Sequence, residues 1–191
     1  SNDATITGGS PTYDTGSLKN NYLDQDNITI PHSTEFNALP LTVSFWIKKD
    51  SGIDTYGGII GKDELVNFNG WQIFTYGGTN EIIAYYAAAG GQIGFRDNSP
   101  PQLMSSPITL GEWTHVAVVF TSTQGLIYIN GQLEANDAVT GTITSAPTTT
   151  QDVEIGRKAG GITNGSFGDG ELKNIRIFNA ALSSLDIDIL S

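Results

Sequence analysis

Hydrophobic and polar residues alternate over short runs along most of the chain, and Gly, Asn, Asp, Pro and Ser separate these runs. In the run 41–48, Val43, Phe45 and Ile47 fall on one face, because successive side chains of a β-strand point to opposite sides. Similar runs cover 27–31, 57–61, 70–76, 81–87, 91–95, 112–120, 125–130, 132–135, 152–156 and 172–178. Short strands separated by turn residues predict an all-β fold.

A helical pattern is expected only at the end of the chain. Ser183 followed by Asp186, within SSLDIDIL, resembles a capping box at the start of a short helix. The many short strands before it predict two packed antiparallel sheets. Because no internal repeat or linker is visible, we expect one domain over 1–191, with 1–15 as a frayed terminus or an edge strand.

Length, composition and charge restrict the partners. A chain of 191 residues can bury a substantial core, and the absence of Cys excludes disulfides, thiol chemistry and Cys-bound zinc. The 20 acidic and 9 basic residues give a net charge of -11, which repels phosphate backbones, so nucleic acid is not an expected partner. No apolar run approaches the ~20 residues of a membrane span, so no membrane insertion is expected. The absence of an initiator Met and of a signal peptide indicates a mature or excised piece.

The segment EWTHVAVVFTSTQGLIYINGQ, residues 112–132, predicts a hairpin followed by a second turn. A strand leads into the turn TSTQG, a return strand follows, and Asn130-Gly131 is a strong tight-turn signal. His115 lies in the middle of the first strand, with no Ser, Cys or carboxylate nearby in sequence to form a catalytic relay. We therefore interpret His115 as a structural residue.

Six segments occur in a characteristic order: LTVSFWIKKD, GGIIGKDE, GWQIFTYGG, LGEWTHVAVVF with GLIYINGQ, VEIGRK, and FGDGELKNIRIFNAALSSLDI. The most specific patterns are W-x-H-V-A-V-V, Y-I-N-G, and the closing G-x-L-x-x-I-R-I-F-N-x-A-L-S. Together they resemble the laminin-G-like family of concanavalin A-like lectin–glucanase jelly rolls, over residues 16 to 190. The resemblance implies a two-sheet antiparallel jelly-roll sandwich, with one sheet concave.

Some members of this family cleave glycans, and glycan cleavage uses paired carboxylates. The resemblance implies that a glucanase would carry an E-x-D-x-x-E strand, and 63–67, 152–156 and 185–190 do not match it. The Arg- and His-containing strands of jelly-roll lyases are also missing from the sequence. We therefore expect a protein that is not an enzyme, and rank a glycan-cleaving enzyme last among three readings.

The family often binds calcium near its first and last strands. Asp26 stands at the early acidic position, but Lys173 and Asn174 occupy the closing positions that are usually acidic. A lysine ammonium cannot ligate a cation and repels it. We hypothesise that Lys173 replaces the ion at a site that includes Asp26 and Asn174. No cofactor is otherwise expected, and calcium held by loop carboxylates is an alternative.

Sugar-binding modules stack aromatic rings on sugar faces and add a few polar contacts. The candidates for ligand binding are Trp71, Tyr76, Tyr85 and Tyr86, with Asn98 as a polar partner. Because Tyr85 and Tyr86 are adjacent in a strand, they point to opposite faces, and one is expected in the core. Trp46 and Trp113 stand at core-strand positions of the family and are interpreted as structural.

The favoured function is a non-catalytic binding module, for glycans, within a larger extracellular or surface protein. The alternative is a structural or adhesion domain of a phage, virus or bacterial surface assembly, with no small ligand. The partner is accordingly a glycan or a surface protein, and the location is extracellular, at the cell surface or on a virion. A glycan module would expose an aromatic pair with polar groups between, whereas a structural domain would expose an apolar patch, ~800 Å² per side in a standard interface.

Overall fold

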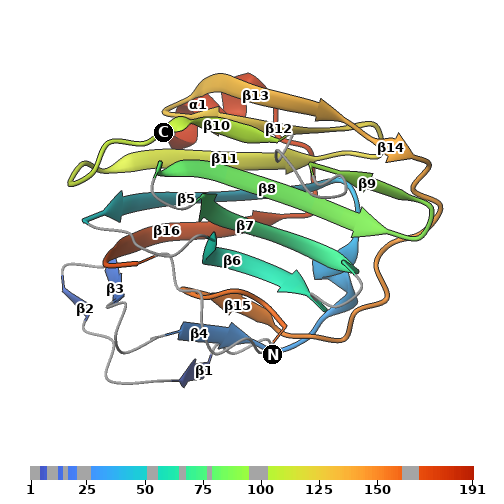
Figure 1. Cartoon of the computed structure of the whole chain (residues 1–191), viewed down its shortest axis with the longest axis horizontal. Helices are drawn as coiled ribbons and strands as arrows, with labels where there is room; N and C mark the ends of the chain where they lie inside the picture. The colour runs from blue at the N-terminus through green and yellow to red at the C-terminus, as the bar shows by residue number, and fades with distance from the viewer. Residues whose placement is uncertain are drawn as a thin grey trace.

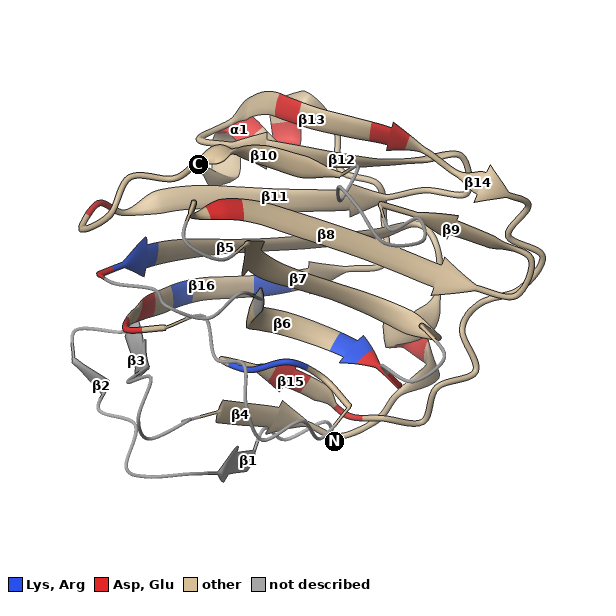
Figure 2. Cartoon of the chain, in the orientation of Figure 1, with Lys and Arg blue, Asp and Glu red and all other residues tan. Residues whose placement is uncertain are grey.

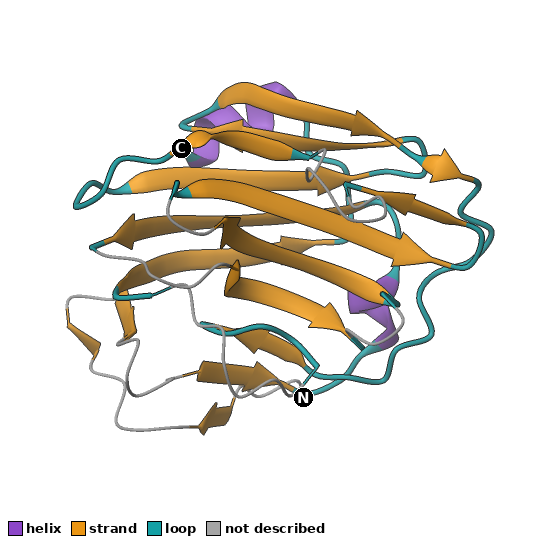
Figure 3. Cartoon of the chain, in the orientation of Figure 1, coloured by secondary structure: helices purple, strands orange, loops and turns teal. Residues whose placement is uncertain are grey.

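The protein is described by a computed structural model over residues 5–7, 13–14, 17–20, 27–50, 56–64, 68–76, 79–94, 103–160 and 168–191. Two antiparallel sheets pack face to face (Figure 1). The helices lie at the periphery of this sandwich (Figure 3). The predicted all-β, two-sheet fold with a short C-terminal helix is thus confirmed.

Within the described residues, sheet A has nine strands. Its order is β1 (Thr5–Thr7), β4 (Asn27–Ile30), β15 (Val153–Ile155), β6 (Tyr56–Asp63), β7 (Gly70–Tyr76), β8 (Glu81–Ala88), β9 (Gly91–Ile93) and β14 (Thr140–Gly141), and β10 (Met104–Pro107) pairs with β8. In the β6–β7–β8 hairpin series, Gln72 lies opposite both Gly61 and Tyr85. This register decides which side chains meet on each face.

Sheet B has seven strands in the part of the chain that the structure describes. Its order is β13 (Gln132–Ala138), β12 (Gln124–Ile129), β11 (Thr114–Phe120), β5 (Leu41–Lys49), β16 (Gly170–Phe178), β3 (Ser17–Asn20) and β2 (Tyr13–Asp14). The central strand β5 pairs with β11 on one side and β16 on the other. The predicted hairpin of β11 and β12 is present, and Asn130 and Gly131 turn into β13 with φ values of 48° and 79°. Positive φ at both residues is what a type I′ turn requires.

One hydrophobic core lies between the sheets. From β5, Val43, Phe45 and Ile47 point inward as the alternation predicted, and all are fully buried. From sheet A, Tyr86 reaches Phe120 of sheet B, with ring centroids 5.7 Å apart. Burying each large apolar side chain stabilises the fold by about 1.5–3 kcal/mol, so this core is its main support.

A short 3₁₀ helix, η1 (Thr34–Asn37), closes one end of the sandwich. The indole Nε1 of Trp71 donates to the Phe36 carbonyl at 2.7 Å, and the Tyr86 hydroxyl donates to the Asn37 carbonyl at 2.6 Å. Both side chains are 0% exposed. The expectation that Trp71 and Tyr86 contact ligand is therefore corrected, because their rings lie in the core and their polar atoms hold η1.

A buried lysine reinforces the same end. The Lys62 ammonium contacts His32 Nδ1 at 2.8 Å and donates to the carbonyls of Thr149 and Gln151. Burial lowers the pKa of Lys62 to about 8, while the negative charge of Asp152 opposes this shift. The lysine thereby connects β6 to the chain that leads into β15.

Helix α1 (Ser184–Leu190) covers part of the outer face of sheet B. Its predicted capping box is present, with Ser183 and Asp186 bonded in both directions. Ile187 is fully buried against Ala117 and Tyr128 of sheet B. The helix therefore covers the β11–β12 half of this face.

His115 is a buried residue of the same face. Its Nε2 lies 2.9 Å from the Ser44 hydroxyl, and its ring centroid lies 5.5 Å from that of Trp46. Burial lowers the pKa of His115 from 6.5 to about 4, and the charge of Arg176 adds to the shift. The imidazole is therefore neutral at pH 7 and packs as part of the sheet.

We expect Tyr86→Phe to lower the free energy of unfolding by about 1–3 kcal/mol, because it leaves the buried Asn37 carbonyl without its donor. Tyr128→Phe is the matched control, since no hydrogen bond involves the Tyr128 hydroxyl within the described residues, and a change within about 0.5 kcal/mol is expected. Urea denaturation measures both. Equal losses in the two variants would contradict the role assigned to Tyr86.

His115 should make stability depend on pH. Its pKa of about 4 in the folded protein lies below the ordinary 6.5, so between these values the unfolded chain binds a proton that the folded chain does not. The free energy of unfolding should therefore fall by up to about 3 kcal/mol as the pH falls from 6.5 to 4. In His115→Gln this part of the slope should vanish. Chemical denaturation at several pH values tests this, and parallel curves for both proteins would refute it.

Candidate functional site

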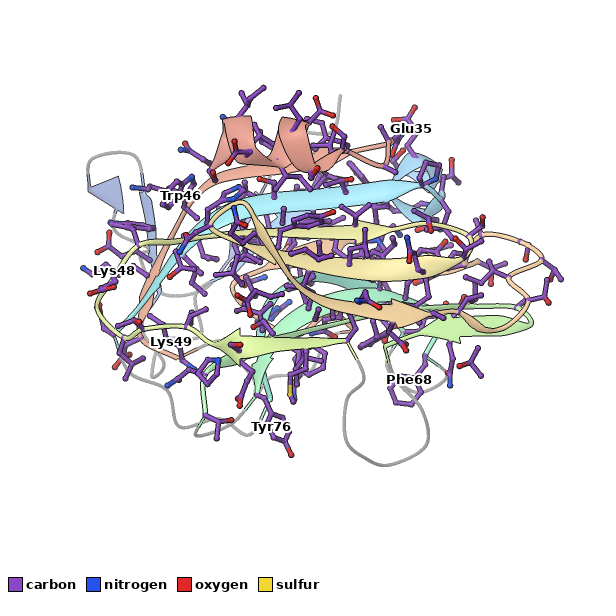
Figure 4. All side chains as sticks on the ribbon, turned by 90° about the horizontal axis from the view of Figure 1, so that it is seen from above. Glu35, Trp46, Lys48, Lys49, Phe68 and Tyr76 are labelled. Carbon is purple, nitrogen blue, oxygen red and sulfur yellow. The ribbon has the colours of Figure 1, made fainter. Side chains whose placement is uncertain are left out.

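The outer face of sheet A carries a cluster of aromatic and polar side chains, which we call the Tyr85 cluster. Its members are Asp63, Phe68, Gln72, Phe74, Tyr76, Ile83, Tyr85, Ala87 and Met104. They come from β6, β7, β8 and β10 and from the chain before β7. In Figure 4, Phe68 and Tyr76 point away from the sandwich on the side opposite α1.

A hydrogen-bonded trio forms the polar centre of the cluster. The Tyr85 hydroxyl donates to Asp63 Oδ2 at 2.5 Å and lies 3.5 Å from Gln72 Oε1. All three side chains are buried. Burial raises the pKa of the Tyr85 hydroxyl well above its usual range, and the Asp63 carboxylate raises it further. Tyr85 therefore remains a neutral donor that holds the carboxylate in place.

Gly61 allows Gln72 to lie across β6. A Cβ atom at Gly61 would come within 2.8 Å of the Gln72 Cγ, so a larger residue would displace this side chain. Within the described part of the chain, the buried Gln72 Nε2 has no hydrogen-bond acceptor. Buried polar groups almost always have partners. An acceptor from outside, such as a ligand hydroxyl, would satisfy this amide.

Aromatic rings surround the trio. The Phe68 ring meets Tyr85 edge to face at a centroid distance of 5.8 Å, and Phe74 meets the same tyrosine at 6.0 Å. Phe68 is 41% exposed and has a φ of 46°, a left-handed conformation that is strained for a bulky residue. Such strain concentrates at binding sites. The cluster therefore combines buried polar groups with an exposed aromatic ring.

The structure brings together only some of the residues that the sequence nominated. Tyr76 and Tyr85 lie on the outer face of sheet A, whereas Trp71 and Tyr86 lie in the core. Asn98 lies outside the described residues. Sequence reasoning missed Phe68, whose strained backbone has no signature in the sequence. It also did not nominate Asp63 for ligand binding, although Asp63 ends β6 and its carboxylate accepts from the Tyr85 hydroxyl.

Two of the three proposed calcium-site residues, Lys173 and Asn174, lie on β16 of sheet B. The Lys173 ammonium is 3.8 Å from the ring centroid of Trp113 and 5.6 Å from that of Trp46. Asn174 is exposed, has a φ of 52°, and lies where the β16–β5 register shifts. Asp26 lies outside the described residues, so the replacement of calcium by Lys173 stays a prediction.

The ranges that the structure describes contain neither a cluster of metal-binding side chains nor a membrane-spanning helix. No group of three or more His, Asp or Glu side chains there is arranged to hold a metal ion. No helix there is long and apolar enough to cross a membrane.

Solved structures with similar folds include three glycan- or receptor-related proteins. The receptor-binding domain of botulinum neurotoxin type G matches with a TM-score of 0.66 and 19% identity, over 99% of this chain and 46% of that one. Trypanosoma rangeli sialidase in complex with sialic acid matches with a TM-score of 0.67 and 16% identity, over 97% and 29%. The chain thus spans less than half of either protein.

A third similar structure is a single domain, and the match covers nearly the whole of it. Domain 4 of AbnA, a GH43 extracellular arabinanase from Geobacillus stearothermophilus in complex with arabinotriose, matches with a TM-score of 0.64 and 18% identity. The match covers 98% of this chain and 87% of that domain. At these identities the likeness concerns the fold.

Comparison by sequence identifies a family for this chain but no individual curated relative. No curated protein matches the chain. Residues 22–188 match the laminin-G-like family described as the concanavalin A-like lectin/glucanases superfamily. The match covers most of the chain and agrees with the two-sheet architecture and with the order of the sequence patterns. The chain therefore belongs to the concanavalin A-like lectin/glucanase superfamily.

Proposed function

We propose that this protein is a non-catalytic carbohydrate-binding module and that it binds a glycan at the Tyr85 cluster. The main observation in support is the buried Gln72 amide, whose nitrogen lacks an acceptor in the described structure. Gln72 contacts Tyr85, and the exposed Phe68 ring packs on the same tyrosine. The similar arabinanase domain, which was solved in complex with arabinotriose, supports this class of ligand. The proposed setting is a larger extracellular or cell-surface protein.

The chemistry of the cluster suits a sugar. A sugar ring has an apolar C–H face that packs on an aromatic ring, and hydroxyl groups that both donate and accept. Phe68 would supply the aromatic surface, and Gln72 Nε2 would donate to one hydroxyl. The Tyr85 hydroxyl, which Asp63 holds in place, would fix the position of Gln72 through its contact with Gln72 Oε1. Tyr76 is a second partly exposed ring on the same face, at the far end of β7.

The number of carboxylates in the cluster favours glycan binding without cleavage. Glycoside hydrolysis uses two carboxyl groups on opposite sides of the scissile bond, roughly 5–9.5 Å apart. In the described part of the cluster, Asp63 is the one carboxylate, and Tyr85 engages it. We therefore propose a binding role in which Asp63 is a positioning group.

A second candidate is a structural or adhesive role with a protein partner. Leu185 and Ile189 of α1 are 68% and 74% exposed, and Leu133 of β13 is also exposed. Apolar residues that gather at the surface often mark a protein interface. This function would use α1 and leave the Tyr85 cluster unoccupied.

The two functions separate in a binding experiment. We expect isothermal titration against arabino-, xylo-, gluco- and galacto-oligosaccharides to find a ligand, and Phe68→Ala to weaken its binding at least tenfold. A tenfold loss corresponds to about 1.4 kcal/mol, which is the scale of one aromatic contact. Leu185→Ser is the control on the other face and should bind as the unmodified protein does.

Thermal unfolding should show that both variants are folded before binding is compared. Absence of binding to the whole panel, or equal binding by Phe68→Ala, would argue against the Tyr85 cluster as a glycan site. In that case, concentration-dependent self-association that Leu185→Ser abolishes would support the structural role.

A further inference from the structure

Among the residues that the structure describes, helix α1 lies over one part of the outer face of sheet B, and the strands beside that part carry an unusual set of side chains. The strand register places Arg176 beside Ser44, and Lys173 beside Trp46, which in turn lies beside His115. Helix α1 covers Ala117 and Val119 instead. We call the group beside α1 the β5–β16 platform, defined by Trp46, Lys48, Trp113, Lys173 and Arg176, with the fully buried Ser44 and His115 beneath it. Trp46 and Lys48 lie together at one end of the molecule in Figure 4.

The platform concentrates positive charge on an acidic protein. Figure 2 shows basic residues on β16 and at the end of β5, whereas α1 and β13 carry acidic ones. Lys48 is neutralised by Glu171 at 3.2 Å and approaches Asp50 at 3.8 Å. Lys173 and Arg176, in contrast, form no ion pair with any residue that the structure describes. Two cations without carboxylates are unexpected where acidic residues outnumber basic ones 20 to 9.

Lys173 and Arg176 come from neighbouring positions on one face of the sheet. Their partners on β5, Trp46 and Ser44, are two residues apart and point to the same side, which separates them by roughly 7 Å along the strand. The irregular register between Lys173 and Arg176, with Asn174 at a φ of 52°, turns both cations to this face. Such bulges often redirect side chains at functional sites. One oxyanion between the two groups could contact both.

Aromatic rings orient one of the cations. The Lys173 ammonium lies over Trp113 and near Trp46, so cation–π attraction fixes the position of the ammonium, which still has N–H groups to donate to an anion. His115 lies beneath the platform, with Nε2 at Ser44 and a buried Nδ1 that has no partner among the described residues. Its imidazole is uncharged at neutral pH, so it adds no repulsion of its own. These contacts prearrange the Lys173 ammonium, and the exposed Arg176 lies beside it on the same face.

We propose that the β5–β16 platform is a second ligand site, which binds a saccharide unit bearing a carboxylate or a sulfate group. Lys173 and Arg176 would contact the oxyanion, and the exposed parts of Trp46 and Trp113 would pack against the sugar ring. The net charge of -11 and the neighbouring Glu171 and Asp50 oppose long polyanions, which favours a single acidic sugar over nucleic acid. The site is on the opposite side of the sandwich from the Tyr85 cluster and is independent of it.

The test uses three probes and the full chain. A galacturonate trisaccharide tests the carboxylate, a sulfated heparin-derived disaccharide tests the sulfate, and galactotriose is the neutral control. Titration calorimetry should show binding of at least one acidic probe that weakens as NaCl rises from 0.05 to 0.5 M. Arg176→Gln and Lys173→Met should each weaken it at least tenfold.

Matched variants distinguish this site from general electrostatics and from the Tyr85 cluster. Lys158→Gln removes the same charge next to β15 and should change the affinity less than twofold. Phe68→Ala should leave acidic-sugar binding unchanged, so failure of one site does not imply failure of the other. If Lys173→Met does not fold, Arg176→Gln decides, because Arg176 is exposed and changing it removes no described contact.

Two results would overturn the proposal. The first is no binding of either acidic probe at millimolar concentration. The second is binding that Arg176→Gln leaves intact, or that Lys158→Gln weakens as much as Arg176→Gln does.

Discussion

The face-to-face packing of sheets A and B is the constraint on which the rest of this structure depends. It commits alternate residues of each strand to one core and sends the residues between them to two outer faces. Tyr86 therefore packs on Phe120 in the core, while its neighbour Tyr85 reaches Asp63 on the outside. A shift of one residue in any of these strands would exchange core and surface. The candidate sites exist because the core holds this register.

Alternation along the chain was sufficient to predict most of the strands, the hairpin of β11 and β12, and the capped helix α1. These features are local, and each has a signal within a few neighbouring residues. Adjacency also predicted that Tyr85 and Tyr86 would diverge. It could not predict which of the two enters the core, because that depends on the partner sheet and on η1. The Asn37 carbonyl of η1 accepts a hydrogen bond from the Tyr86 hydroxyl.

The site was harder to predict because it is assembled by contacts distant in sequence. Asp63, Gln72 and Tyr85 belong to three strands, and only their mutual register brings them together. The left-handed conformation of Phe68 has no sequence signal, since Gly or Asn would be the usual residues there. Similarly, Trp46 and Trp113 were interpreted as structural, and their contact with Lys173 became visible only once β11, β5 and β16 were aligned. Membership of the superfamily identifies the fold, but function depends on such sites.

The central claim is that a glycan binds on the outer face of sheet A. The most direct measurement is an amide NMR titration of the isotopically labelled protein with the oligosaccharide panel. The account predicts shifts that centre on Gly61, Phe68, Gln72 and Tyr85 and that spare the amides of α1. Shifts confined to α1, or no shift with any glycan at millimolar concentration, would contradict it.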